Sequence, residues 1–117
     1  MLTSGGKVVI EVPHARDFLL SFLDSAPFRS FTLWSEHLLL HTRESLRRYL
    51  EESGFREITI RGFQRYPLAN HLHWLAQERP GGHQQWSMLR NAELDTAYGK
   101  MLSDLDFTDT LIAEARI

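Results

Sequence analysis

The 117-residue sequence contains no cysteine, so it has no disulfide bonds and no thiolate ligands for a metal ion. It also lacks an excess of either charge, because 13 Lys and Arg stand against 15 Asp and Glu and give a net charge of -2. Proteins that bind nucleic acid or an anionic membrane surface through electrostatics carry a basic excess or a basic patch. We therefore expect neither a nucleic acid nor a membrane as a partner.

Long apolar runs are scarce as well. No stretch approaches the roughly 20 residues that span a bilayer, and residues 1–7 lack the apolar centre of a signal peptide. These features favour a cytoplasmic protein. A chain of this length has room for one hydrophobic core, and it contains no repeat or low-complexity tract, so we expect a single domain over residues 1–117.

Three segments have the patterns of β-strands. Residues 7–12 follow a Gly-Gly pair and are rich in β-branched side chains, which is typical of a strand buried on both faces. Residues 56–63 alternate, with Ile58 and Ile60 on one face, and residues 110–117 alternate in the same way. Helical patterns lie between these strands, so the sequence predicts an α/β fold with flanking helices.

The helical segments are recognised by the spacing of their apolar residues and by their ends. Residues from Ala15 onward favour a short amphipathic helix that ends before Pro27, and residues 28–40 have no clean period and favour an extended or irregular segment. Thr42 is a suitable N-cap for a helix that buries Leu46, Tyr49 and Leu50 and ends at Gly54. We expect helices over residues 43–53, residues 69–77 and much of residues 83–103.

Several segments, taken in order, resemble the second half of a class I S-adenosylmethionine-dependent methyltransferase domain. They are residues 2–13 (LTSGGKVVIEVP), 37–46 (HLLLHTRESL) and 52–55 (ESGF). Residues 64–72 (QRYPLANHL) and 80–83 (PGGH) resemble a bacterial subgroup of that superfamily. The resemblance covers nearly the whole chain.

The resemblance implies a partial Rossmann-like sheet. Residues 7–12 would be the fifth strand of a seven-stranded sheet, residues 56–63 the sixth, and residues 110–117 an antiparallel seventh strand inserted between them. The family holds S-adenosylmethionine with a Gly-rich turn after its first strand and a carboxylate at the end of its second, and neither lies in this sequence. The resemblance therefore implies the C-terminal part of a methyltransferase, with S-adenosylmethionine bound by the full-length parent and not by this chain alone.

Candidate site residues follow from the expected sheet, because ligands of open α/β sheets lie beyond the carboxyl ends of the parallel strands. His14 or His37 could act as the general base that takes a proton from an acceptor hydroxyl or amine, and Arg65 could hold an anionic acceptor. The other expected acceptor-binding residues are Arg16, Glu36, Tyr66, Asn70 and His71. All of these side chains could instead cap helices or face solvent.

Two further groups of residues favour structural roles. The six histidines include the pairs His37 with His41 and His71 with His73, but no cysteine or carboxylate accompanies them at a recognised ligand spacing, so we expect no metal site. Trp34, Trp74 and Trp86 could form a stacking surface, but aromatic residues at helical spacing are more often part of a core.

The sequence leaves two functions open. The first is a segment of a methyltransferase that contributes sheet and crevice and acts on a small-molecule acceptor. The alternative is a non-catalytic α+β module for binding or dimerisation. The resemblance places a further strand beside residues 7–12 that this chain lacks, and an edge built from Val8, Val9, Ile10 and Val12 favours pairing with a second copy. We therefore expect a homodimer through this sheet edge.

Overall fold

The computed structural model describes residues 5–35 and 40–117, apart from the side chains of residues 34 and 35. Its strands are β1 (Lys7–Pro13), β2 (Arg56–Phe63) and β3 (Thr110–Arg116). Its helices are α1 (Ala26–Ser35), α2 (Arg43–Glu52), α3 (Leu68–Gln77), α4 (Gly82–Gln85) and α5 (Ala92–Asp104), with a π-helical turn η1 (Phe18–Phe22) and a 3-10 turn η2 (Ser87–Leu89). None of the helices described is long and apolar enough to cross a bilayer.

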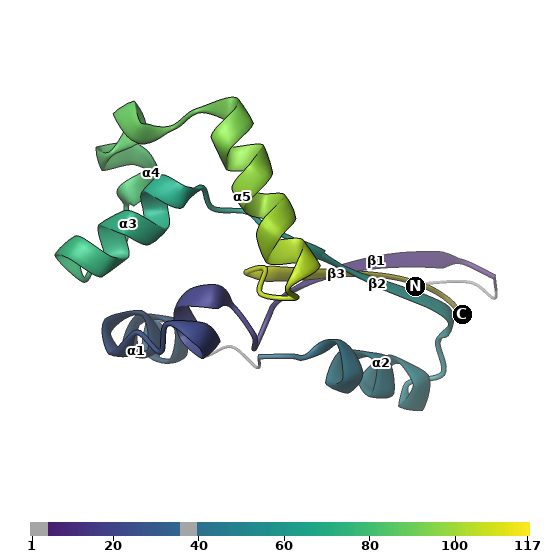
Figure 1. The fold of residues 1–117 in the computed structure, drawn as a ribbon. Helices are drawn as coiled ribbons and strands as arrows, with labels where there is room; N and C mark the ends of the chain where they lie inside the picture. The colour runs from purple at the N-terminus through teal and green to yellow at the C-terminus, as the bar shows by residue number, and fades with distance from the viewer. Residues whose placement is uncertain (1–4, 36–39) are drawn as a thin grey trace.

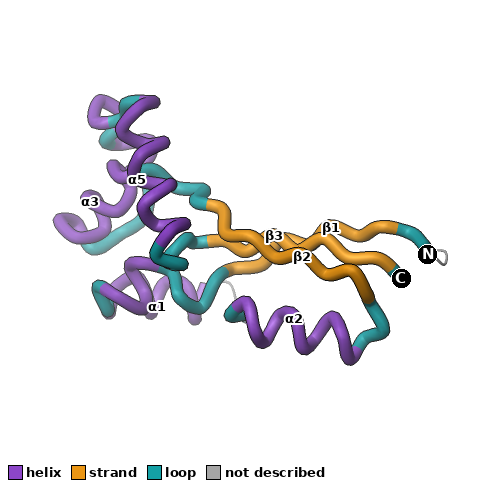
Figure 2. The backbone as a smooth tube through the Cα atoms, turned by 45° about the vertical axis from the view of Figure 1, so that its right-hand side comes forward, coloured by secondary structure: helices purple, strands orange, loops and turns teal. Residues whose placement is uncertain are grey.

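The three strands form one sheet in the order β1-β3-β2, and β3 is antiparallel to both neighbours. It follows that β1 and β2 run in the same direction, and their carboxyl ends meet where Pro13 and Phe63 both pair with Thr110. The predicted α/β class, with a last strand inserted antiparallel between the other two and helices beside the sheet, is confirmed. Figure 2 shows α1, α3 and α5 gathered at this end of the strands.

One face of the sheet carries the hydrophobic core. The register places Ile10, Ala113 and Ile60 side by side, so their side chains share a face. Leu46 and Leu50 of α2 pack against this face and are almost completely buried, and Figure 1 shows α2 lying along the sheet. Burial of these apolar surfaces is the main contribution that holds α2 against the strands.

Both ends of α2 follow the sequence prediction. The Thr42 hydroxyl accepts a hydrogen bond from the Ser45 amide at 3.1 Å, and the Ser45 hydroxyl accepts one from the Thr42 amide at 2.9 Å. Gly54, with φ of 92°, takes the left-handed conformation after the last turn. The prediction that Tyr49 is buried is wrong, because its side chain is 57% exposed; the buried stripe of α2 consists of Leu46 and Leu50, one turn apart.

The prediction that β1 is buried on both faces is also wrong. Val9 is 56% exposed, whereas Ile10 and Val12 pack against the core on the opposite face. The face with Val9 also carries Lys7, whose Nζ lies 3.3 Å from a carboxylate oxygen of Glu114 on β3. Since β1 pairs only with β3 among the described strands, it is an amphipathic edge strand.

Three predictions about the segments between the strands need correction. The segment after Ala15 forms only the π-helical turn η1, and α1 begins at Ala26, so residues 28–35 are helical and not irregular. Pro27 opens a helix here, because the amides of a first helical turn have no intrahelical partner and a missing N–H costs nothing. The long helix expected within residues 83–103 begins only at Ala92, where the Asn91 side chain accepts from the Leu94 amide at 3.0 Å.

Close packing between α3 and α4 generates a test of this fold. A Cβ atom on Gly82 would lie 2.8 Å from the Cα of Asn70 and would also collide with His73. A Cβ on Gly99, inside α5, would meet nothing closer than the Gln64 side chain at 3.6 Å, which is ordinary contact. The two glycines therefore differ in packing although both lie in helices.

We expect Gly82→Ala to destabilise the chain by about 1–3 kcal/mol through overpacking. Gly99→Ala is the matched control and should stabilise it by about 0.5–1 kcal/mol, because alanine has the higher helix propensity. Urea denaturation of the two variants beside the wild type measures both effects. Equal effects of the two substitutions would contradict the close approach of α3 and α4.

Candidate functional site

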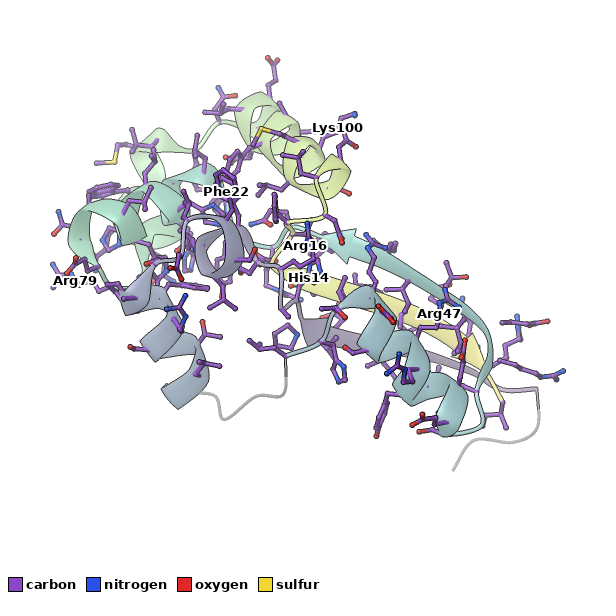
Figure 3. The ribbon with its side chains drawn as sticks, turned by 60° about the horizontal axis from the view of Figure 1, so that its bottom comes forward. His14, Arg16, Phe22, Arg47, Arg79 and Lys100 are labelled. Atoms are coloured by element: carbon purple, nitrogen blue, oxygen red, sulfur yellow. The ribbon has the colours of Figure 1, made fainter. Side chains whose placement is uncertain are left out.

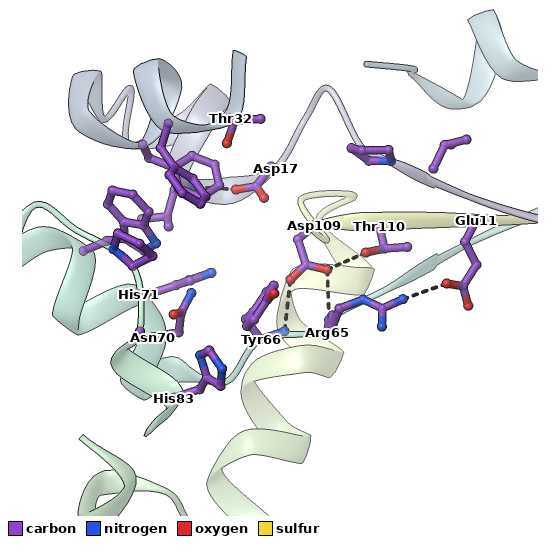
Figure 4. A pocket seen from close by; sticks show the side chains of 18 residues that line it. Glu11, Asp17, Thr32, Arg65, Tyr66, Asn70, His71, His83, Asp109 and Thr110 are labelled. Atoms are coloured by element: carbon purple, nitrogen blue, oxygen red, sulfur yellow. Dashed lines mark hydrogen bonds and ion pairs between the residues drawn. The ribbon is translucent and has the colours of Figure 1, made fainter. Parts of the chain in front are cut away.

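A cavity of about 350 Å³ lies at the carboxyl ends of β1 and β2. Its walls come from the end of β1, the segment around η1 and α1, the loop between β2 and α3, and the first turns of α3 and α4 (Figure 4). One wall is aromatic: the Trp74 ring lies 5.1 Å from that of Phe28 and 5.3 Å from that of Phe31, measured between centroids. An apolar cavity with a few polar groups is the usual form of a small-molecule site.

Asp109 organises the polar wall. Its carboxylate accepts hydrogen bonds from the backbone amides of Arg65 and Tyr66 at 2.9 and 3.0 Å, and from the side chains of Gln64 and Thr110, both at 2.9 Å. The Gln64 side chain in turn accepts from the Asp109 amide at 3.0 Å. Burial raises the pKa of Asp109, although these hydrogen bonds oppose the shift. The carboxylate therefore holds the loop after β2 against the start of β3.

Asp17 is the second carboxylate in the cavity, and it has far fewer partners. Asp17 is 6% exposed and, as the N-cap of η1, accepts a hydrogen bond from the Leu19 amide at 2.9 Å; the Leu20 amide also stabilises its carboxylate. Burial and the nearby charge of Asp109 raise the pKa of Asp17 to about 7. A carboxyl group with such a pKa can both accept and release a proton near neutral pH.

His71 lies deeper in the same wall. Its Nδ1 is 2.5 Å from the hydroxyl of Tyr98, and its ring stacks on Phe18 at 6.1 Å. Burial lowers the pKa of His71 to about 4, so the imidazole is neutral at neutral pH. Burial also raises the pKa of Tyr98, so its hydroxyl stays protonated. This pair gives the wall polar character without adding charge.

The outer rim carries one ion pair. Arg65 reaches Glu11 on β1 with a nitrogen–oxygen distance of 2.7 Å, and both side chains are about half exposed. Arg65 is the only Lys or Arg among the described residues that line the cavity. Its charge is therefore already matched by a carboxylate.

The structure brings four of the predicted acceptor-binding residues to one place. Arg65, Tyr66, Asn70 and His71 all line the cavity, and all four are labelled in Figure 4. Their acceptor-binding role stays a prediction. Glu36 and His37 lie outside the described residues, as does the side chain of Trp34.

His14 and Arg16 are not among the residues that line the cavity. Figure 3 labels the two side chains close to each other. His14 is 1% exposed, and its Nδ1 lies 2.9 Å from the carbonyl oxygen of Thr108, to which it can donate. Its Nε2 lies 3.8 Å from a carboxylate oxygen of Asp106. The same carboxylate accepts a hydrogen bond from the Nε of Arg43 at 2.7 Å and lies 3.4 Å from the Nε of Arg16. Burial lowers the pKa of His14. The geometry makes this cluster a polar joint between the end of β1 and the loop before β3, in which only His14 is buried.

Sequence reasoning missed Asp17, Asp109 and Tyr98. Asp109 could have been found, because it directly precedes an antiparallel strand whose amino end lies at the same sheet edge as the carboxyl ends of β1 and β2. Asp17 and Tyr98 carried no such signal. Trp74 is 3% exposed and belongs to the core, as its helical spacing predicted.

Among the described residues, no site fits a metal ion or S-adenosylmethionine. Within residues 5–35 and 40–117, no group of three or more His, Asp or Glu side chains could hold a metal ion. The described glycines with positive φ, Gly5, Gly54 and Gly81, precede a strand or follow a helix. A glycine turn that cradles a cofactor follows a strand and opens a helix, so these residues do not fit S-adenosylmethionine.

The raised pKa of Asp17 makes stability depend on pH. Between its ordinary value of 3.8 and about 7, the folded chain keeps a proton that the unfolded chain has lost, so Asp17 lowers stability as the pH rises through this range. We expect Asp17→Asn to gain stability over the wild type between about pH 4 and pH 7, by up to about 1.4 kcal/mol per pH unit, and no further above that range.

Urea denaturation of both proteins at several pH values gives this difference. Asp104→Asn, which removes an exposed carboxylate of α5, is the control. If the curves for the two variants run parallel, Asp17 is not a buried carboxyl group with a raised pKa.

The comparisons with known proteins gave one likeness of structure. A scan against models of protein families found no match, and a search of curated proteins found none. A search of solved structures found the crystal structure of a SAM dependent methyltransferase from Archaeoglobus fulgidus, with 18% sequence identity and a TM-score of 0.48. The alignment covers 98% of this chain and 46% of that one, so the chain spans about half the length of that structure.

Proposed function

We propose that this chain is the C-terminal part of an S-adenosylmethionine-dependent methyltransferase, of the bacterial subgroup that residues 64–72 and 80–83 resemble, and that its cavity holds a small-molecule acceptor. One observation carries the proposal: a last strand lies antiparallel between two parallel strands, with the cavity at their carboxyl ends. This is the sheet that the sequence resemblance implies. We further propose that the protein is cytoplasmic.

The residues of the cavity have separate roles in this proposal. Asp17 takes the proton that an acceptor heteroatom releases as it is methylated, since it is buried, has unused acceptor capacity and has a pKa near neutrality. Tyr66, Asn70 and His71 orient the acceptor, and Arg65 closes the rim with Glu11. His14, which the sequence analysis named as a candidate base, lies outside the cavity and positions the end of β1 through Thr108.

S-adenosylmethionine itself belongs to the other half of the domain in this proposal, because the described residues do not fit it. The chain alone is therefore expected to bind no cofactor. The longer protein would combine this acceptor cavity with the Gly-rich turn and carboxylate that the family uses.

Calorimetric titration with S-adenosylmethionine tests the proposal. The 117-residue chain should show no saturable binding up to concentrations near a millimolar, whereas the protein from the complete reading frame should bind. Saturable micromolar binding to the chain alone would contradict the assignment to a C-terminal half. Lack of binding to the complete protein would leave the alternative, a non-catalytic α+β module.

We also propose a homodimer formed through the edge of β1. The outer edge of this strand has no described neighbour, and Val9 exposes an apolar side chain beside it. Unpaired edges of this kind favour pairing with another strand, and a two-fold axis would make the contact self-complementary.

Light scattering measures the mass of the particle in solution for the wild type and for Val9→Lys. We expect a dimer for the wild type and a monomer for Val9→Lys, because a charge beside the edge opposes strand pairing. Leu75→Lys, on the exposed side of α3, is the control and should leave the dimer intact. A monomeric wild type would refute the exposed-edge argument, and a dimer that survives Val9→Lys would place the interface elsewhere.

A further inference from the structure

Three side chains around the cavity have hydrogen-bonding capacity that the described residues do not use. Asn70 is 5% exposed, and no described residue bonds its side-chain amide. His83 also lines the cavity, and its Nδ1 is buried with no partner in the described part of the chain. The Asp17 carboxyl group interacts with the backbone amides of Leu19 and Leu20 only, and no described side chain donates to it. Buried polar groups are normally paired, so these groups point to a bound molecule.

The unused capacity is mainly that of acceptors. Asp17 offers a carboxylate oxygen, Asn70 an amide oxygen beside its two N–H donors, and His83 the ring nitrogen Nδ1. Asp109 is different, because its four hydrogen bonds already occupy its oxygens. A ligand with several hydrogen-bond donors would satisfy these acceptors.

The charges of the cavity favour a cation. Its lining contains three carboxylates, Glu11, Asp17 and Asp109, against the single guanidinium of Arg65. Arg65 is paired with Glu11 and its charge also acts on Asp109, whereas no described Lys or Arg forms an ion pair with Asp17. His71 does not supply a charge, since it is neutral. The aromatic wall of Phe28, Phe31 and Trp74 adds ring faces and edges that suit an apolar group or an adjacent cation.

We propose that the cavity binds a small primary amine as its ammonium ion, with the nitrogen toward Asp17 and Asn70 and an apolar body against the aromatic wall. An ammonium group has three donors and one positive charge, which matches both the unused acceptors and the inner carboxylates. That this amine is the methyl acceptor rests on the proposed function; that the cavity binds it does not.

Other ligand classes fit less well. A carboxylate or phosphate would meet Asp17 and Asp109, and the only cation of the lining is already paired. An anion is therefore excluded by repulsion and by the lack of a free positive partner. A neutral alcohol could bond Asn70 but would leave the inner carboxylate charge unmatched.

The test uses three probes of one shape and different charge: benzylamine, benzyl alcohol and benzoate. Each is titrated into the 117-residue chain near neutral pH, and binding is followed by NMR shifts of the Asn70 side-chain amide and the Trp74 indole. We expect benzylamine to bind at least about tenfold more tightly than the other two, and to shift both resonances. This measurement needs no S-adenosylmethionine, so its failure is distinct from a failure of the methyltransferase proposal.

Asp17→Asn should remove most of the preference for benzylamine, by about fivefold or more, while Asp104→Asn, at the surface of α5, should preserve it. Equal binding of benzylamine and benzyl alcohol by the wild type would overturn the proposal, as would tighter binding of benzoate or no binding of any probe. These outcomes need only the wild-type chain, so they remain decisive if Asp17→Asn does not fold. A preference that survives intact in a folded Asp17→Asn would also overturn it.

Discussion

The fully bonded carboxylate of Asp109 is the constraint on which the arrangement of the site depends. A buried carboxylate is costly unless donors surround it, and here two backbone amides and two side chains do so. These donors belong to the loop after β2 and to the first residue of β3. By binding both, Asp109 sets the direction in which the chain leaves β2 and enters α3. Tyr66, Asn70 and His71 reach the cavity wall as a result.

The cavity illustrates how similar residues acquire different chemistry from their surroundings. Asp17 is buried and Asp109 is half-buried, and burial raises the pKa of each. The carboxylate oxygens of Asp109 accept four hydrogen bonds from protein groups, so Asp109 acts as a structural group. Asp17 interacts only with the backbone amides of Leu19 and Leu20 and keeps acceptor capacity for a ligand. His14 shows both situations in one ring, because its Nδ1 is paired with the Thr108 carbonyl and its Nε2 is buried with no hydrogen-bond partner among the described residues.

The sheet has an uneven distribution of apolar surface. Its core lies on the face covered by α2, where Leu46 and Leu50 meet Leu111 and Ala113. The opposite face mixes charged side chains with the exposed Val9. The remaining long helices gather beyond the carboxyl ends of β1 and β2, so the cavity forms where the sheet stops and the helices begin (Figures 1 and 2). The fold thus separates the element that stabilises the sheet from the elements that shape the site.

The sequence by itself determined the features that depend on neighbouring residues. Alternation identified β2 and β3, and Thr42 and Gly54 marked the ends of α2, because pleats, caps and left-handed turns follow from local backbone and side-chain chemistry. The exposure of Val9 and the place of Pro27 in the first turn of α1 could not be predicted from the sequence, because both depend on what packs nearby. Only the tertiary structure brought Asp17, His71 and Tyr98 together from η1, α3 and α5. Contacts between residues so distant in sequence leave no periodic signal, because they are set by packing and not by the local chain.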